Sequence, residues 1–70
     1  MKYVCKEAFE INGILVGNKG NILVINDAVP KENENSEDVQ GYCDVENLTT
    51  HQIYEATWID VDESVLEVIE

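Results

Sequence analysis

The side chains of this 70-residue chain that can do chemistry are mainly its carboxylates, fifteen in all, against four lysines and no arginine. Several carboxylates recur two residues apart: Glu32/Glu34, Asp44/Glu46 and Asp60/Asp62. On a β-strand, residues i and i+2 project from one face about 6.6 Å apart, which is twice the strand rise. That separation is comparable to the spacing of successive phosphates along a nucleic-acid strand. Rows of such carboxylates are therefore predicted to offer Lys and Arg side chains the contacts that phosphates offer.

The charge is concentrated in one half of the chain. Residues 1–31 hold all four lysines and three acids, whereas residues 32–70 hold twelve acids and no lysine or arginine. The formal net charge of -11 is larger in magnitude than solubility requires, and the pI is near 4.1. A field of one sign attracts partners of the opposite sign. We therefore expect a basic protein partner, and neither direct nucleic-acid binding nor membrane binding.

Ten carboxylates of the acidic half are the candidate partner-binding residues. They are Glu32, Glu34, Glu37, Asp38, Asp44, Glu46, Glu55, Asp60, Asp62 and Glu63. Interfaces concentrate their binding energy in aromatic anchors, a role open to Tyr42, Tyr54 or Trp58, although Trp58 can equally belong to the core. Blocks of charge without apolar residues usually form solvated loops, which predicts a mobile acidic loop at about 31–38. Beyond Val39 the acids are interleaved with apolar residues, which places them on a folded surface.

Other kinds of chemistry find little support in the sequence. The Asp60–Ser64 run resembles the opening of a calcium loop, but Val65 stands where that loop needs glycine. Cys5, Cys43 and His51 match no zinc-ligand spacing, and both cysteines are predicted to be buried apolar residues. No nucleophile or paired catalytic carboxylates are identifiable. We expect no catalytic residue, no metal and no cofactor, and therefore a protein that is not an enzyme.

The elements that position these residues are predicted to be strands. Of the twenty Val, Ile and Leu residues, sixteen are the β-branched Val or Ile, which favour strands. We predict a single mainly β domain over residues 1–70 with a thin core. Its strands should cover residues 2–11, 21–27, 39–48 and 52–61. The second of these is predicted to be the most buried, because its "ILVI" core is apolar on both faces.

Turn residues separate the predicted strands. Asn12-Gly13 and Gly17–Gly20 are typical turn sequences, and "NLTTHQ" is expected to close a hairpin. At the C-terminus, Asp60 or Asp62 can cap one helical turn that leads into a short edge strand. The alternative is a helix over 62–70. Since the chain shows neither a signal peptide nor a membrane span, we expect it in the cytosol.

This order of strands, early double turn, long polar loop, hairpin and one-turn helix resembles small five-stranded SH3-like, partly open barrels. The resemblance implies that fold but not proline-rich peptide binding. That activity needs a tryptophan pair in an aromatic groove, and this chain has one Trp.

The stretch "ENENSEDVQGYCDVEN" and the lysine-free tail to Glu70 resemble small acidic host-takeover proteins of phages, in particular a HU-blocking DNA mimic of a Bacillus phage. That resemblance implies an inhibitor that occupies the DNA-binding surface of a basic host protein, such as the nucleoid protein HU, in the bacterial cytoplasm or nucleoid. The lysines of the first half are compatible with a homodimer. The alternative is a structural or adaptor β domain of a phage or bacterial assembly, acidic only for solubility.

Overall fold

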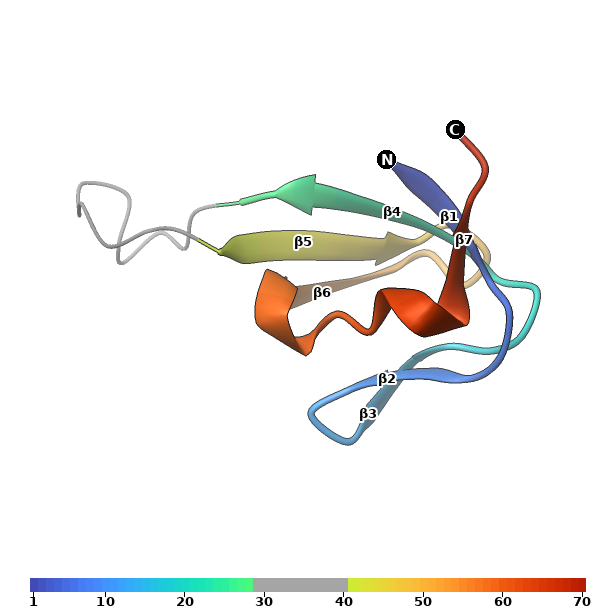
Figure 1. The fold of residues 1–70 in the computed structure, drawn as a ribbon, viewed down its shortest axis with the longest axis horizontal. Coiled ribbons are helices and arrows are strands. Elements are labelled where there is room, and N and C mark those ends of the chain that lie inside the picture. Colours follow the sequence, from blue (N-terminus) through green and yellow to red (C-terminus); the bar gives the residue numbers. More distant parts are fainter. Residues whose placement is uncertain (29–40) are drawn as a thin grey trace.

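The structure, a computed structural model, describes residues 1–28 and 41–70 and is mainly β (Figure 1). A five-stranded antiparallel sheet has the strand order β6-β5-β4-β1-β7, and a two-stranded sheet pairs β2 with β3. The large sheet contains β1 (Lys2–Cys5), β4 (Ile22–Asp27), β5 (Tyr42–Asn47), β6 (Gln52–Thr57) and β7 (Leu66–Val68). The small sheet contains β2 (Phe9–Ile11) and β3 (Ile14–Gly17). The mainly β class predicted from the sequence is confirmed, whereas the predicted mobile loop at 31–38 lies outside the described residues.

The first predicted strand, residues 2–11, is divided between the two sheets. After Cys5 the chain leaves the large sheet, and the Lys6 amide bonds to the carbonyl oxygen of Val65 at 2.7 Å. The chain then enters the β2–β3 hairpin, whose turn is the predicted one, with φ of 51° at Asn12 and 80° at Gly13. The hairpin returns close to β1, because a Cβ atom on Gly17 would lie 2.9 Å from Cys5 Sγ.

Strand β4 has two fully buried residues against three in β5, so the prediction that it would be the most buried strand is wrong. Leu23 and Ile25 are buried, whereas Ile22 and Val24 are half-buried. The reason is that the hairpin and the C-terminal turns cover the same side of the sheet. The opposite side of β4 has no layer packed on it from the described residues.

The β5–β6 hairpin forms where "NLTTHQ" predicts it, with His51 exposed at the turn and a φ of 65°. Strand β6 ends at Thr57, not at residue 61 as predicted. Trp58–Asp60 form the 3-10 turn η2 instead. Two local contacts hold this turn: Thr57 Oγ1 donates to Asp60 Oδ2 at 2.8 Å, and the Val61 amide bonds to the carbonyl oxygen of Trp58 at 3.1 Å.

The C-terminal segment is a capped turn followed by a strand, one of the two predicted alternatives. Asp62 accepts a hydrogen bond from the Ser64 amide and caps the 3-10 turn η3 (Glu63–Val65). The chain then continues as β7, which pairs antiparallel with β1. The alternative of a helix over 62–70 is wrong, because the edge of β1 provides ladder partners that a helix could not use.

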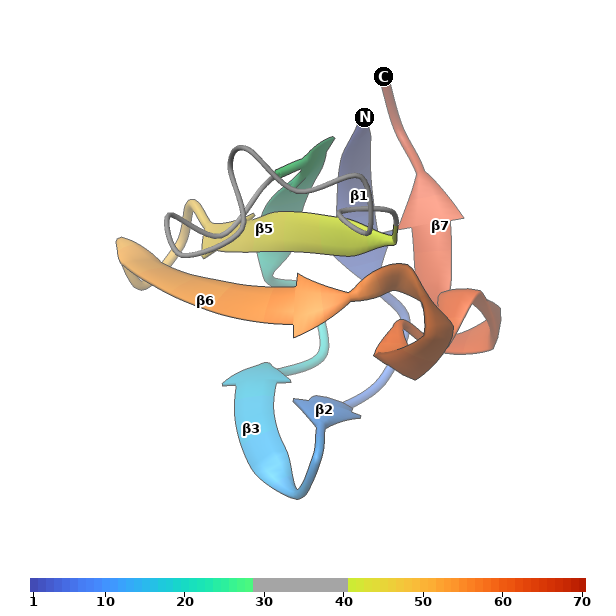
Figure 2. The same cartoon turned by 90° about the vertical axis from the view of Figure 1, so that its left-hand side faces the viewer.

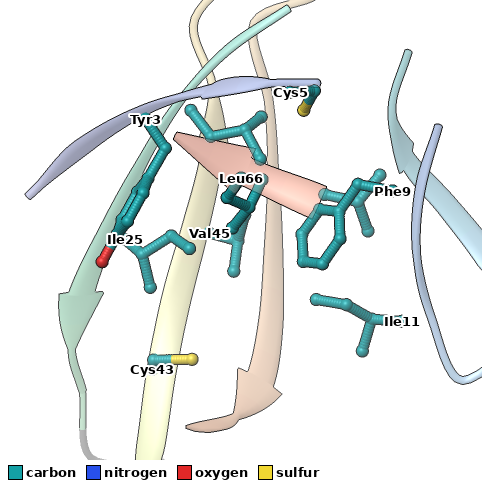
Figure 3. Close-up of a cluster of buried hydrophobic side chains, with 10 residues drawn as sticks. Tyr3, Cys5, Phe9, Ile11, Ile25, Cys43, Val45 and Leu66 are labelled. Carbon is teal, nitrogen blue, oxygen red and sulfur yellow. The ribbon is translucent and has the colours of Figure 1, made fainter. Parts of the chain in front are cut away.

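Residues of both sheets form the core, and the β2–β3 hairpin lies below the large sheet in the view of Figure 2. Phe9 and Ile11 of the hairpin point toward Val45 and Leu66 of the large sheet (Figure 3). The buried hydrophobic residues are Tyr3, Cys5, Phe9, Ile11, Val16, Leu23, Ile25, Cys43, Val45 and Leu66. Both cysteines are buried and free, as the sequence predicted. In the described parts of the chain, β6 and β7 remain the two edges of the large sheet, so no closed barrel is formed.

Candidate acidic binding face

The candidate site is the outer face of β4, β5 and β6, meaning the side of these strands turned away from the core. Antiparallel partners share a face, so the strand register assigns each residue to one side. Asp44 of β5 pairs with Asn26 of β4 on one side and Glu55 of β6 on the other. All three are exposed, whereas Val45, the next residue along β5, is buried. The row Asn26–Asp44–Glu55 therefore lies on the outer face.

Asp44 and Glu55 form a pair of like charges directly across the β5–β6 ladder. The Cβ atoms of such partners lie about 4.5–5.5 Å apart, and like charges there destabilise a sheet. No lysine or arginine occurs anywhere from residue 32 to residue 70, so these two strands contain no cation to compensate the pair. The structure thus tolerates a local electrostatic cost on an open surface.

Glu46 extends this pair into a triangle. It lies two residues after Asp44 on β5, so both side chains leave the same face about 6.6 Å apart. The diagonal from Glu46 to Glu55 is about 7–8 Å by the usual geometry of a ladder. The i, i+2 spacing predicted from the sequence is therefore realised for Asp44 and Glu46.

The next row of the outer face alternates charged and apolar residues. Glu46 pairs with Val24 on one side and with Ile53 on the other, and Val24 pairs in turn with Lys2 of β1. Ile53 stands on the edge strand β6, and its side chain is 66% exposed. Sequence reasoning missed Ile53. The available signal was its spacing: Ile53 stands two residues before Glu55 on the same strand, so the two side chains share a face.

A second group of carboxylates lies where β4 ends and β5 begins. Asp27 Oδ1 accepts a hydrogen bond from Trp58 Nε1 at 2.7 Å. The pKa of the Cys43 thiol is raised, first by burial and then by the charges of Asp44, Asp27 and Asp60, so all three carboxylates act on one point. Asp27 was also missed, because it precedes the acidic half in sequence and only the pairing of β4 with β5 brings it there.

The remaining described acids of the predicted site lie elsewhere. Asp62 and Glu63 stand at η3, next to β7 at the other edge of the large sheet. Hydrogen bonds from the side chain and backbone amide of Ser64 lower the pKa of Asp62. The pKa of Tyr3 is raised by burial and, to a smaller extent, by Glu63. Asp60 lies in η2 and Asp62 caps η3, so the spacing expected of i, i+2 residues on a strand does not apply to this pair.

Two of the three candidate aromatic anchors face inward. Tyr54 and Trp58 are half-buried and pack against the core, and the indole N–H of Trp58 is used by Asp27. Tyr42 stands two residues before Asp44 on β5, so its side chain leaves the same side of the sheet. It is the candidate aromatic residue on the outer face. The other four candidate residues, Glu32, Glu34, Glu37 and Asp38, lie outside the described residues.

Cations and metal ligands are sparse in the described residues. One ion pair forms there, between Lys2 Nζ and Glu70 Oε2 at 2.8 Å, and it lowers the pKa of Glu70. Within residues 1–28 and 41–70, no three His, Cys, Asp or Glu side chains are grouped so that they could hold a metal ion. The same residues contain no helix with the length and apolar character needed to cross a membrane.

Comparison of the chain with protein-family models, curated proteins and solved structures found no significant match.

Proposed function

We propose that this protein is a DNA-mimicking inhibitor, which binds the basic DNA-binding surface of a host protein such as the nucleoid protein HU and thereby blocks DNA binding. The observation that carries the proposal is the Asp44–Glu55 pair, for which the described residues provide no ion-pair partner, with Glu46 beside it on the same face. Like charges in register lower the stability of a sheet, and a basic partner would convert that cost into binding energy.

The geometry of the triangle fits a surface that normally receives phosphates. Its three residues occupy ladder positions about 5–8 Å apart, and lysine and arginine side chains bind carboxylates and phosphates with similar charge-assisted hydrogen bonds. Arginine in particular forms paired bonds with either group. The resemblance to acidic phage proteins supports the same function. In this proposal the chain acts without catalysis, on an SH3-like scaffold, in the cytoplasm or nucleoid of a bacterial host.

The proposal is tested by comparing two variants with the same charge change. D44N/E55Q removes the cross-strand pair, and E7Q/E10Q removes two exposed carboxylates from the other half of the chain. Affinity for purified HU is measured by titration calorimetry at low salt, and duplex DNA is then added as a competitor. We expect D44N/E55Q to weaken binding about tenfold, equivalent to ~1.4 kcal/mol, and E7Q/E10Q to change it by less than about threefold. DNA should displace the wild-type chain.

Two results would contradict the proposal. If both variants lose affinity equally, net charge alone attracts the partner and no face is specific. If wild-type protein binds HU without competing with DNA, or binds no basic DNA-binding protein in a bacterial lysate, mimicry is excluded. The structural or adaptor β domain would then be the better description.

A further inference from the structure

The outer face contains an apolar stripe, made of Ile53 and Val24 and interrupted by Glu46, that phosphate mimicry does not require. Ile53 is 66% exposed and stands directly across the ladder from Glu46, two residues before Glu55. On the other side of Glu46 lies Val24, which is half-buried. An isoleucine and a valine therefore flank one carboxylate, and a second carboxylate lies next to the isoleucine.

The position of Ile53 makes its exposure informative. Edge strands of natural sheets are usually protected from unwanted pairing by charged side chains, prolines or bulges. Strand β6 is an edge of the large sheet and its only charged residue is Glu55. An exposed isoleucine at such an edge adds a risk of aggregation, which a binding role would offset.

The surrounding charge indicates which kind of partner can cover this stripe. A second copy of the chain would bring Glu46 and Glu55 against the same carboxylates, with no lysine on β5 or β6 to compensate them. A basic surface would instead pair its cations with Asp44, Glu46 and Glu55. Charge complementarity therefore favours a basic partner over self-association.

Building on the function proposed above, we infer that Ile53 is an apolar anchor that contacts an apolar side chain of the partner, placed between the partner's cations. DNA-binding surfaces that work in the minor groove combine these two features, because they insert apolar wedges between base steps and hold the backbone with Lys and Arg. The anchor makes binding partly independent of salt and distinguishes such a partner from a plain polycation.

The test compares Ile53→Ser with Ile59→Ser as a matched control. Ile59 is 91% exposed in η2, so both variants remove an exposed isoleucine, but only one removes it from the outer face. Circular dichroism and thermal melting first establish that both variants fold. Dissociation constants are then measured for HU and for polylysine at low and high salt.

We expect I53S to weaken binding to HU about tenfold, by a factor that stays constant as salt rises, and to leave polylysine binding unchanged. I59S should alter neither affinity by more than about twofold. The effect of D44N/E55Q on HU binding should shrink at high salt, since it is electrostatic.

The outcomes separate this inference from the proposed function. If D44N/E55Q weakens binding to HU and I53S does not, the acidic mimic stands and the apolar anchor is wrong. Equal losses from I53S and I59S would also overturn the anchor. If sedimentation shows a wild-type dimer that I53S dissociates, the stripe is a self-association surface and the basic partner is excluded from it. If neither I53S nor D44N/E55Q affects HU binding, the proposed function itself fails.

Discussion

Asn47 is a buried polar residue at the end of β5, and its side chain connects three separate segments. Its Nδ2 donates to the Val16 carbonyl oxygen at 2.9 Å and to Asn21 Oδ1 at 3.1 Å. Its Oδ1 accepts from the amides of Thr49 at 2.9 Å and Thr50 at 3.0 Å. Both donors and the acceptor oxygen are thus used, as burial of an amide requires. This one side chain ties the β2–β3 hairpin and the 18–21 turn to the β5–β6 hairpin.

Replacing Asn47 by Asp should destabilise the fold strongly, because a carboxylate cannot donate the two Nδ2 bonds and would be buried without a cation. We expect a loss of about 2–4 kcal/mol in the free energy of unfolding, measured by urea denaturation. The matched control is N18D, which adds the same charge at an exposed turn position next to Lys19 and should change stability by less than about 0.5 kcal/mol. A similar small effect for N47D would show that the Asn47 bonds contribute little.

The pairing of β5 with β6 is the element on which the candidate site depends. Because Asp44 faces Glu55 across this ladder, replacing Glu55 by Lys should create a pair of opposite charges. We expect E55K to increase the free energy of unfolding by about 0.2–1 kcal/mol, while it weakens binding to HU. The carboxylates that favour partner binding are thus predicted to lower the stability of the β5–β6 hairpin.

E10K provides the control for this prediction. It makes the same change of net charge on β2, where Glu10 pairs with the uncharged Leu15. If E10K stabilises the protein as much as E55K does, the gain comes from lower net charge and not from the cross-strand pair. Urea denaturation of both variants in the same buffer distinguishes the two causes.

At the scale of the whole molecule, repulsion among carboxylates should limit stability. The chain has a formal net charge of -11, and among its described residues Lys2 and Glu70 form one ion pair. Screening shortens the reach of such repulsion from about 30 Å at 0.01 M salt to about 3 Å at 1 M. We expect the free energy of unfolding to rise by about 1 kcal/mol, or the melting temperature by about 4–8 °C, between low and high sodium chloride.

The same salt titration on a D44N/E46Q/E55Q/D60N variant should give a smaller rise, since part of the repulsion has been removed. A melting temperature that falls as salt increases would contradict the prediction. It would mean that favourable charge pairs outweigh the repulsion between carboxylates.

Four features were predictable from the sequence: the mainly β class, the turn at Asn12-Gly13, the hairpin turn that ends at Gln52 and the cap at Asp62. Each depends on neighbours in the chain: β-branched composition, turn residues or a side chain that bonds two residues ahead. The departure of the chain at Lys6 and the end of β6 at Thr57 were not predictable in this way. The departure at Lys6 is accompanied by a backbone bond to the distant Val65, and the turn at Trp58 by the bond of its indole N–H to the distant Asp27.

The sequence by itself determined the amount of negative charge, its concentration after residue 31 and the i, i+2 spacing that puts Asp44 and Glu46 on one face. Only the tertiary structure decided which other residues join them. Strand register places Glu55 beside Asp44 and Ile53 beside Glu46, and it leaves Asp62 and Glu63 at another edge. The physical reason is that side-chain alternation is a local property of a strand, whereas register follows from the ladder bonds and core packing of strands far apart in the chain.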